Sequence, residues 1–108
     1  MLTKRWLYQN EEGLRIEVIN AWKLFPKLRS REALLVNGQA VSTRETGPHD
    51  SFKTTTAYTH TAVVRHKEKD YRIKIKLGSK CPGFAVGCHI FVGDELVGGD
   101  TASKLMFL

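Results

Sequence analysis

The chain has 108 residues, of which 42% are hydrophobic and 26% are charged, as in one soluble globular domain and unlike a disordered chain. Its apolar runs are only a few residues long, which excludes a bilayer-spanning helix of ~20 residues. No apolar stretch of the kind found in secretory signals follows the basic N-terminus, so a cytoplasmic location is expected. The 17 Lys and Arg residues outnumber the 11 Asp and Glu residues, and the net charge of +6 favours an acidic partner.

The first part of the chain predicts strands. The apolar segment 6–8 indicates a short first strand, and apolar and charged residues alternate over 14–18, which predicts a half-buried strand. The expected core positions of that strand are Leu14, Ile16 and Val18. The alternation extends to residue 24. The apolar spacing over 18–25 also fits a helix. Pro26 disfavours the helix, because its ring removes a backbone hydrogen-bond donor and restricts the backbone of the preceding residue.

Two dipeptides predict tight hairpins. Asn37-Gly38 and Gly93-Asp94 each lie between apolar runs, and such residues supply the positive φ angles that match strand twist. Residues 42–56 are rich in Ser, Thr, Gly and Asp and predict a long loop. The apolar segments 88–92 and 104–108 predict further strands, and the abrupt apolar end leaves open whether the native chain continues.

The stretch from Tyr58 to Leu77 predicts the best-defined hairpin. With Glu68 and Lys69 as its turn, His66 lies opposite Tyr71 and Val64 opposite Ile73. A shift of one residue would bury the charged side chains, so the division into two faces is strongly constrained. The expected inner face holds His60, Ala62, Val64, His66, Tyr71, Ile73, Ile75 and Leu77. The expected outer face holds Thr59, Thr61, Val63, Arg65, Arg72, Lys74 and Lys76.

These elements predict one all-β domain covering residues 1–108. Its expected architecture is an antiparallel β-sandwich or flattened barrel of about seven to eight short strands, built from consecutive hairpins. The turn segments Val36–Gln39 and Val92–Glu95 resemble those of the all-β domain of Fas apoptotic inhibitory molecules. This resemblance covers the turn dipeptides alone; it implies a compact sandwich of hairpins and carries over no activity and no site residues.

Cys81, Cys88 and His89 are the groups with the most reactive chemistry. Six residues separate the two cysteines, which departs from the usual spacing of zinc ligands, and adjacent residues on a strand point to opposite faces. A cysteine nucleophile needs a nearby base, and no catalytic or phosphate-binding motif occurs. We expect no metal, no cofactor and no enzymatic activity, with Cys88 in the core. A metal- or thiol-dependent protein centred on these three residues is a second alternative.

The outer face of the central hairpin is the candidate contact surface. The candidate partner-binding residues are Arg65, Arg72, Lys74 and Lys76, extended by Lys27, Arg29 and Arg31. Single-strand nucleic-acid binders stack bases on aromatic rings, and this face is expected to have none. The first hypothesis is therefore a binding module that contacts an acidic protein; nucleic-acid binding through the same face is the alternative. The simplest interpretation is a solvated face that blunts edge pairing.

Overall fold

The computed structural model describes residues 2–23, 25–81 and 85–106. In this part of the chain nine strands and one short helix follow one another. They are β1 (Leu2–Gln9), β2 (Arg15–Lys23), β3 (Arg29–Val36), β4 (Gln39–Thr46), α1 (Phe52–Thr56), β5 (Tyr58–His66), β6 (Lys69–Cys81), β7 (Val86–Val92), β8 (Glu95–Gly99) and β9 (Lys104–Met106). The predicted all-β class is confirmed. No helix in the described ranges is long and apolar enough to cross a membrane.

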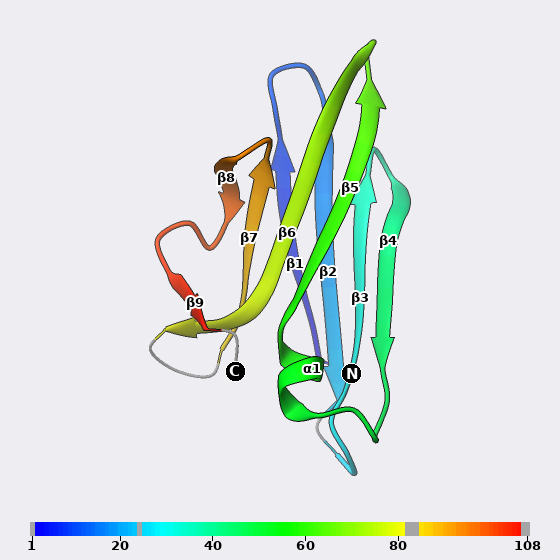
Figure 1. Cartoon of the computed structure of the whole chain (residues 1–108), viewed down its shortest axis with the longest axis vertical. Coiled ribbons are helices and arrows are strands. Elements are labelled where there is room, and N and C mark those ends of the chain that lie inside the picture. The colour runs from blue at the N-terminus through cyan, green and yellow to red at the C-terminus, as the bar shows by residue number, and fades with distance from the viewer. Residues whose placement is uncertain (1, 24, 82–84, 107–108) are drawn as a thin grey trace.

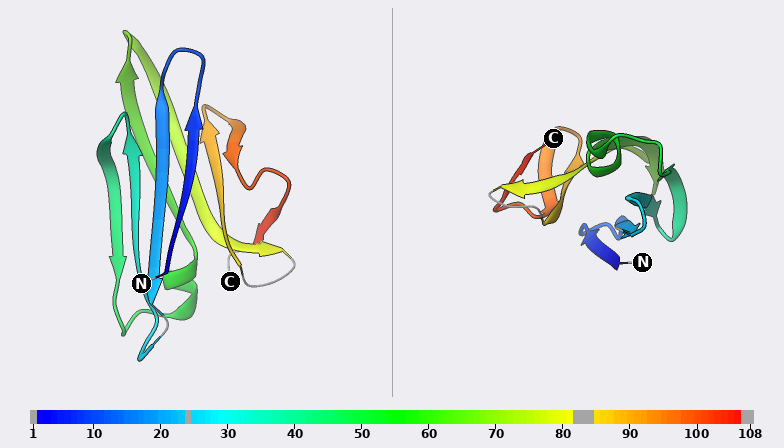
Figure 2. Two further views of the ribbon diagram at one scale, coloured as in Figure 1. Left: turned by 180° about the vertical axis from the view of Figure 1, so that it is seen from behind. Right: turned by 90° about the horizontal axis from the view of Figure 1, so that it is seen from below.

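Consecutive hairpins build two antiparallel sheets, which form two layers (Figure 1). Sheet A has the strand order β1-β2-β3-β4. Sheet B has the order β5-β6-β7-β8, and β9 pairs with the far end of β6. Along the sides of the molecule β5 lies beside β4 and β8 lies beside β1. The two layers therefore enclose a shared interior, which is seen end-on in the right-hand view of Figure 2.

Apolar side chains from both sheets fill this interior. The buried core consists of Trp6, Leu14, Ile16, Val18, Leu34, Val36, Tyr71, Ile73, Ile75, Leu77, Cys88 and Ile90. The predicted positions Leu14, Ile16 and Val18 are confirmed, because each is at most 1% exposed. All eight expected inner-face residues of the central hairpin are buried or half-buried, which confirms that division. Burial of each large aliphatic side chain contributes about 1.5–3 kcal/mol, so this core stabilises the sandwich.

The turn of the central hairpin is one position earlier than the sequence predicts. Lys67 and Glu68 have φ values of +49° and +66° and form a two-residue turn, so that His66 pairs with Lys69 and not with Tyr71. Two consecutive positive φ values match the twist of the strands. The pairing moves by two residues, so every side chain keeps its predicted face. The predicted turns at Asn37-Gly38 and Gly93-Asp94 are confirmed.

Three further expectations change. The expected loop over 42–56 is wrong, because β4 continues to Thr46 and α1 begins at Phe52. Strand β4 can consist of polar residues because its inward side chains contact buried polar groups of β3 and β5. The Ser51 hydroxyl caps α1 by accepting a hydrogen bond from the Thr54 N–H at 3.1 Å. The helical alternative over 18–25 is wrong, because β2 continues as a strand to Lys23. The first strand, expected to be short, is eight residues long. Residues 24, 107 and 108 lie outside the described ranges.

Candidate functional site

Four predicted cations lie together on the outer face of sheet B, and we call Arg65, Arg72, Lys74 and Lys76 the cationic face. Strand β6 supplies three of them on alternate residues, and β5 supplies Arg65. In the ladders, Lys74 lies opposite Thr61 on one side and opposite Phe91 on the other. The pleat places all four on the side away from the core, as the alternation predicts.

The cationic face contains an aromatic ring, which corrects the expectation that it has none. The Nζ atoms of Lys74 and Lys76 lie 4.7 Å and 5.7 Å from the centre of the Phe91 ring. These distances suit cation–π attraction. The sequence predicts the strand that carries Phe91 but not its place beside β6, so the ring could not be assigned to this face.

A shallow groove of about 480 Å³ runs beside Lys74. Its walls include Thr61, Val63, Lys74 and Gly93. The side of this groove formed by β5 includes Val63, which is 69% exposed. The cationic face therefore combines charge with apolar surface.

Two carboxylates partly neutralise this face. Arg65 lies 3.3 Å from Asp70 and Arg72 lies 3.7 Å from Asp94, and all four side chains are at least 63% exposed. Exposed ion pairs of this kind contribute about 0–1 kcal/mol, so a partner's carboxylate could replace them at little cost. These pairs involve the two arginines, whereas Lys74 and Lys76 lie beside Phe91.

The structure does not place the other candidate cations on the cationic face. Arg29 and Arg31 belong to β3 and lie on the outer side of sheet A, since Ser30 between them is buried. Arg31 pairs with Glu45 at 2.6 Å. Lys27 is exposed in the connection between β2 and β3. These three residues therefore do not extend the cationic face.

Cys88 and His89 point to opposite sides of β7, as expected for neighbours on a strand. Cys88 is fully buried, and burial raises the pKa of its thiol, which keeps it protonated. The His89 Nε2 lies 3.1 Å and 2.7 Å from the carbonyl oxygens of Asp100 and Ser103, so this nitrogen carries the proton and donates. The side chain of Cys81 lies outside the described part of the structure. Within that part, no three His, Cys, Asp or Glu side chains gather as metal ligands would.

A buried ionic cluster, which the sequence does not predict, joins β3, β4 and β5. Glu32 is 1% exposed and receives two hydrogen bonds from Arg44, at 3.2 Å and 2.7 Å. Its Oε1 also lies 2.9 Å from His60 Nε2, and His60 Nδ1 lies 2.7 Å from Ser42 Oγ. Burial raises the pKa of Glu32, but the hydrogen bonds from His60 and Arg44 outweigh it and lower the pKa overall. The only sequence signal is that Glu32 and His60 occupy inward-facing positions.

Ser42, His60 and Glu32 are hydrogen-bonded in the order of a nucleophile, a base and an orienting carboxylate. Its surroundings indicate a structural role. His60 is 1% exposed, so a substrate cannot reach the group that would act as the base. Arg44 binds the carboxylate through two nitrogens, which makes Glu32 the centre of a buried ion pair.

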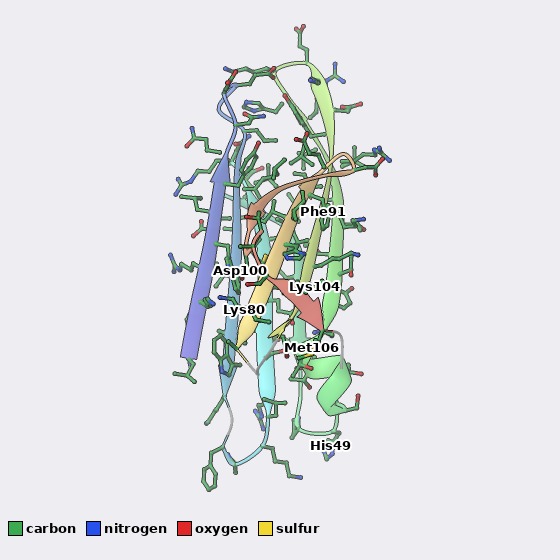
Figure 3. The ribbon with its side chains drawn as sticks, turned by 90° about the vertical axis from the view of Figure 1, so that its left-hand side faces the viewer. His49, Lys80, Phe91, Asp100, Lys104 and Met106 are labelled. Carbon is green, nitrogen blue, oxygen red and sulfur yellow. The ribbon has the colours of Figure 1, made fainter. Side chains whose placement is uncertain are left out.

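A second polar cluster is built around Asp100, at the end of the acidic, glycine-rich segment 93–100. The Asp100 Oδ2 accepts hydrogen bonds from the Trp6 indole at 3.0 Å and from the Cys88 N–H at 2.9 Å. Its Oδ1 lies 3.0 Å from Lys80 Nζ, and Figure 3 shows these two side chains close together. Burial raises the pKa of Asp100, but Lys80 and the Cys88 N–H lower it overall. These bonds hold the exit from β8 against both sheets.

No protein-family model, no curated protein and no solved structure matches this chain. The resemblance in turn dipeptides therefore gains no support from these comparisons. Function has to be argued from the surfaces and clusters described above.

Proposed function

We propose that this chain is a non-enzymatic binding module that holds an acidic segment of a partner protein against the cationic face. The observation that carries the proposal is the placement of Lys74 and Lys76 over Phe91, beside the exposed Val63. Protein interfaces combine an aromatic or aliphatic anchor with a charged rim in this way. Carboxylates of the partner would pair with the lysines, and an apolar side chain would enter the groove along Val63.

An acidic protein fits this surface better than a nucleic acid does. Single-strand binders present several rings on which successive bases stack, and two lysine ammonium groups already lie over Phe91. The groove wall holds Thr61 and Val63 where a stacking ring would be needed. Carboxylate pairing and contact with an aliphatic side chain are both features that an acidic peptide supplies.

The test compares two labelled probes by fluorescence anisotropy: a peptide of alternating Glu and Leu residues, and a thymine oligonucleotide of equal charge. Each is titrated at about 30 mM and about 300 mM salt, because screening lengths differ several-fold between these conditions. We expect the peptide to bind more tightly than the oligonucleotide, and to weaken steeply with salt.

A matched pair of charge reversals locates the binding surface. The variant K74E/K76E should weaken peptide binding by about tenfold or more. The variant R29E/R31E changes the net charge equally on the outer side of sheet A and should change peptide binding by less than about threefold. Equal losses in both variants would show a response to net charge alone. Tighter binding of the oligonucleotide, or no binding of either probe at low salt, would overturn the proposal.

A further inference from the structure

The connection between β2 and β3 forms the lower tip of the molecule along its longest axis (Figure 1). Its described residues are 25–28, which follow the end of β2 at Lys23 and precede the start of β3 at Arg29. Phe25 is 82% exposed and is the most exposed large hydrophobic side chain in the described part of the chain. The tip therefore presents an aromatic ring to solvent beyond the ends of these two strands.

Three cations flank this ring in the chain. Lys23 and Arg29 lie directly opposite each other in the β2–β3 ladder, on the outer side of sheet A, and Lys27 is exposed in the connection. Like charges directly opposite each other destabilise a sheet. None of the three pairs with a carboxylate of any described residue, whereas the next cation on β3, Arg31, lies 2.6 Å from Glu45. The positive charge at the tip is therefore not neutralised within the described structure.

A neighbouring acidic residue does not supply the counter-charge. Asp50 belongs to the connection from β4 to α1, which reaches the same end of the molecule (Figure 1). Its Oδ2 accepts a hydrogen bond from the Gly47 N–H at 2.7 Å, within its own connection, and it pairs with no described cation. The tip thus combines an exposed ring with cations that require an external anion.

A bilayer that contains anionic lipid meets both requirements. Its headgroups carry the negative charge, and its boundary with the acyl chains accepts an aromatic ring. A protein partner fits less well, because a stable protein interface buries ~800 Å² on each side. The tip is one end of a molecule that measures 46 Å along its longest axis and 27 Å and 18 Å across it, so it offers a narrow surface.

We propose that this tip binds the surface of a bilayer that contains anionic lipid. Phe25 would enter the level of the headgroups and acyl chains, and the three cations would lie against the anionic headgroups. Contact through the tip leaves the cationic face on sheet B free. The membrane site therefore does not rest on the function proposed for that face.

The experiment measures co-sedimentation with vesicles of phosphatidylcholine alone and with about 30% phosphatidylserine, at about 30 mM and about 300 mM salt. We expect binding to the anionic vesicles, weaker at high salt, and none to the neutral vesicles. Each cation near an anionic surface strengthens binding about fivefold, so K23E/R29E should weaken it about twentyfold or more. The matched control K74E/K76E changes the net charge equally on the cationic face and should weaken binding less than about threefold.

Two substitutions of Phe25 test insertion of the ring, and urea unfolding checks that every variant is folded. Phe25→Ser should weaken vesicle binding about tenfold. Phe25→Trp should keep binding, and its emission should shift to shorter wavelength on the anionic vesicles and be quenched by lipids brominated in the acyl chains. The wild-type protein, with Trp6 and Trp22, gives the background for this signal.

Four results would overturn the proposal. They are no binding to anionic vesicles at low salt, equal binding to neutral vesicles, equal losses in K23E/R29E and K74E/K76E, and no spectral shift for Phe25→Trp. The Glu–Leu peptide used for the cationic face distinguishes a membrane from a protein at the tip. If Phe25→Ser weakens binding of that peptide and leaves vesicle binding unchanged, the tip contacts protein and the membrane proposal is wrong.

Discussion

Replacement of Glu32 by glutamine should be among the most destabilising changes of a polar side chain in this protein. The side chain of Glu32 is 1% exposed and that of its partner Arg44 is 14% exposed, so the substitution leaves a nearly buried guanidinium without its counter-charge. Arg44 would keep the Thr54 carbonyl at 2.6 Å and the Tyr58 ring at 4.1 Å, neither of which is an anion. Breaking one partner of a buried pair costs about 3–5 kcal/mol; because glutamine still offers one acceptor, we expect about 3 kcal/mol.

The loss can be measured as a change in the midpoint of urea unfolding, followed by tryptophan fluorescence. A loss of that size is a large share of the ~5–15 kcal/mol that stabilises an ordinary domain. The matched control is Glu45→Gln, which removes the partner of Arg31 from a pair in which both side chains are 66% exposed, and which should cost less than about 1 kcal/mol. The double variant E32L/R44M should recover part of the stability, because apolar replacements remove both charges but leave the buried His60 Nε2 without its acceptor. If Glu32→Gln costs no more than Glu45→Gln, the reasoning about the buried pair is wrong.

Three other predictions concern the carboxylates of Glu32 and Asp100, Gly99, and the thiol of Cys88. The pKa values of Glu32 and Asp100 are lowered from their ordinary values of 4.5 and 3.8, so the stability that these carboxylates provide is fully present above those values and is lost as the pH falls below them. The urea midpoint should therefore decrease between about pH 7 and pH 2.5. Glu32→Gln should make this decrease in the midpoint smaller. Gly99→Ala should destabilise by about 2 kcal/mol or more in thermal unfolding, because φ is +82° and the new Cβ would clash with the Cys88 carbonyl oxygen; an unchanged midpoint would contradict this. In a Cys81→Ser background, the raised pKa and burial of Cys88 should make its thiol react with a disulfide reagent far more slowly when folded than in urea, and equal rates would refute that.

The strands and their buried faces could be predicted because each depends on a local period of two. Residues 14–18 and the central hairpin show this, since their inward positions follow from alternation alone. The turn at Lys67 and Glu68 could not, because positive φ angles are uncommon outside glycine, asparagine and aspartate, and nothing local marks these two residues. Residues 42–46 could not be predicted as a continuation of the strand after the Asn37-Gly38 turn, because their inward positions hold polar residues whose buried partners only the structure shows.

The cationic face depends on which strands are neighbours, and a single sequence does not contain that information. Phe91 joins the cationic face because β7 pairs with β6, and the sequence predicts both strands without predicting the pair.

The two buried polar clusters lie where the sheets approach each other without ladder hydrogen bonds. At one side, Glu32 of β3 binds His60 of β5 across the junction of β4 and β5. At the other, Trp6 of β1 binds Asp100, just after β8. A sandwich of two sheets relies on non-directional apolar packing to hold its layers, whereas directed bonds at both sides fix how one layer is positioned on the other.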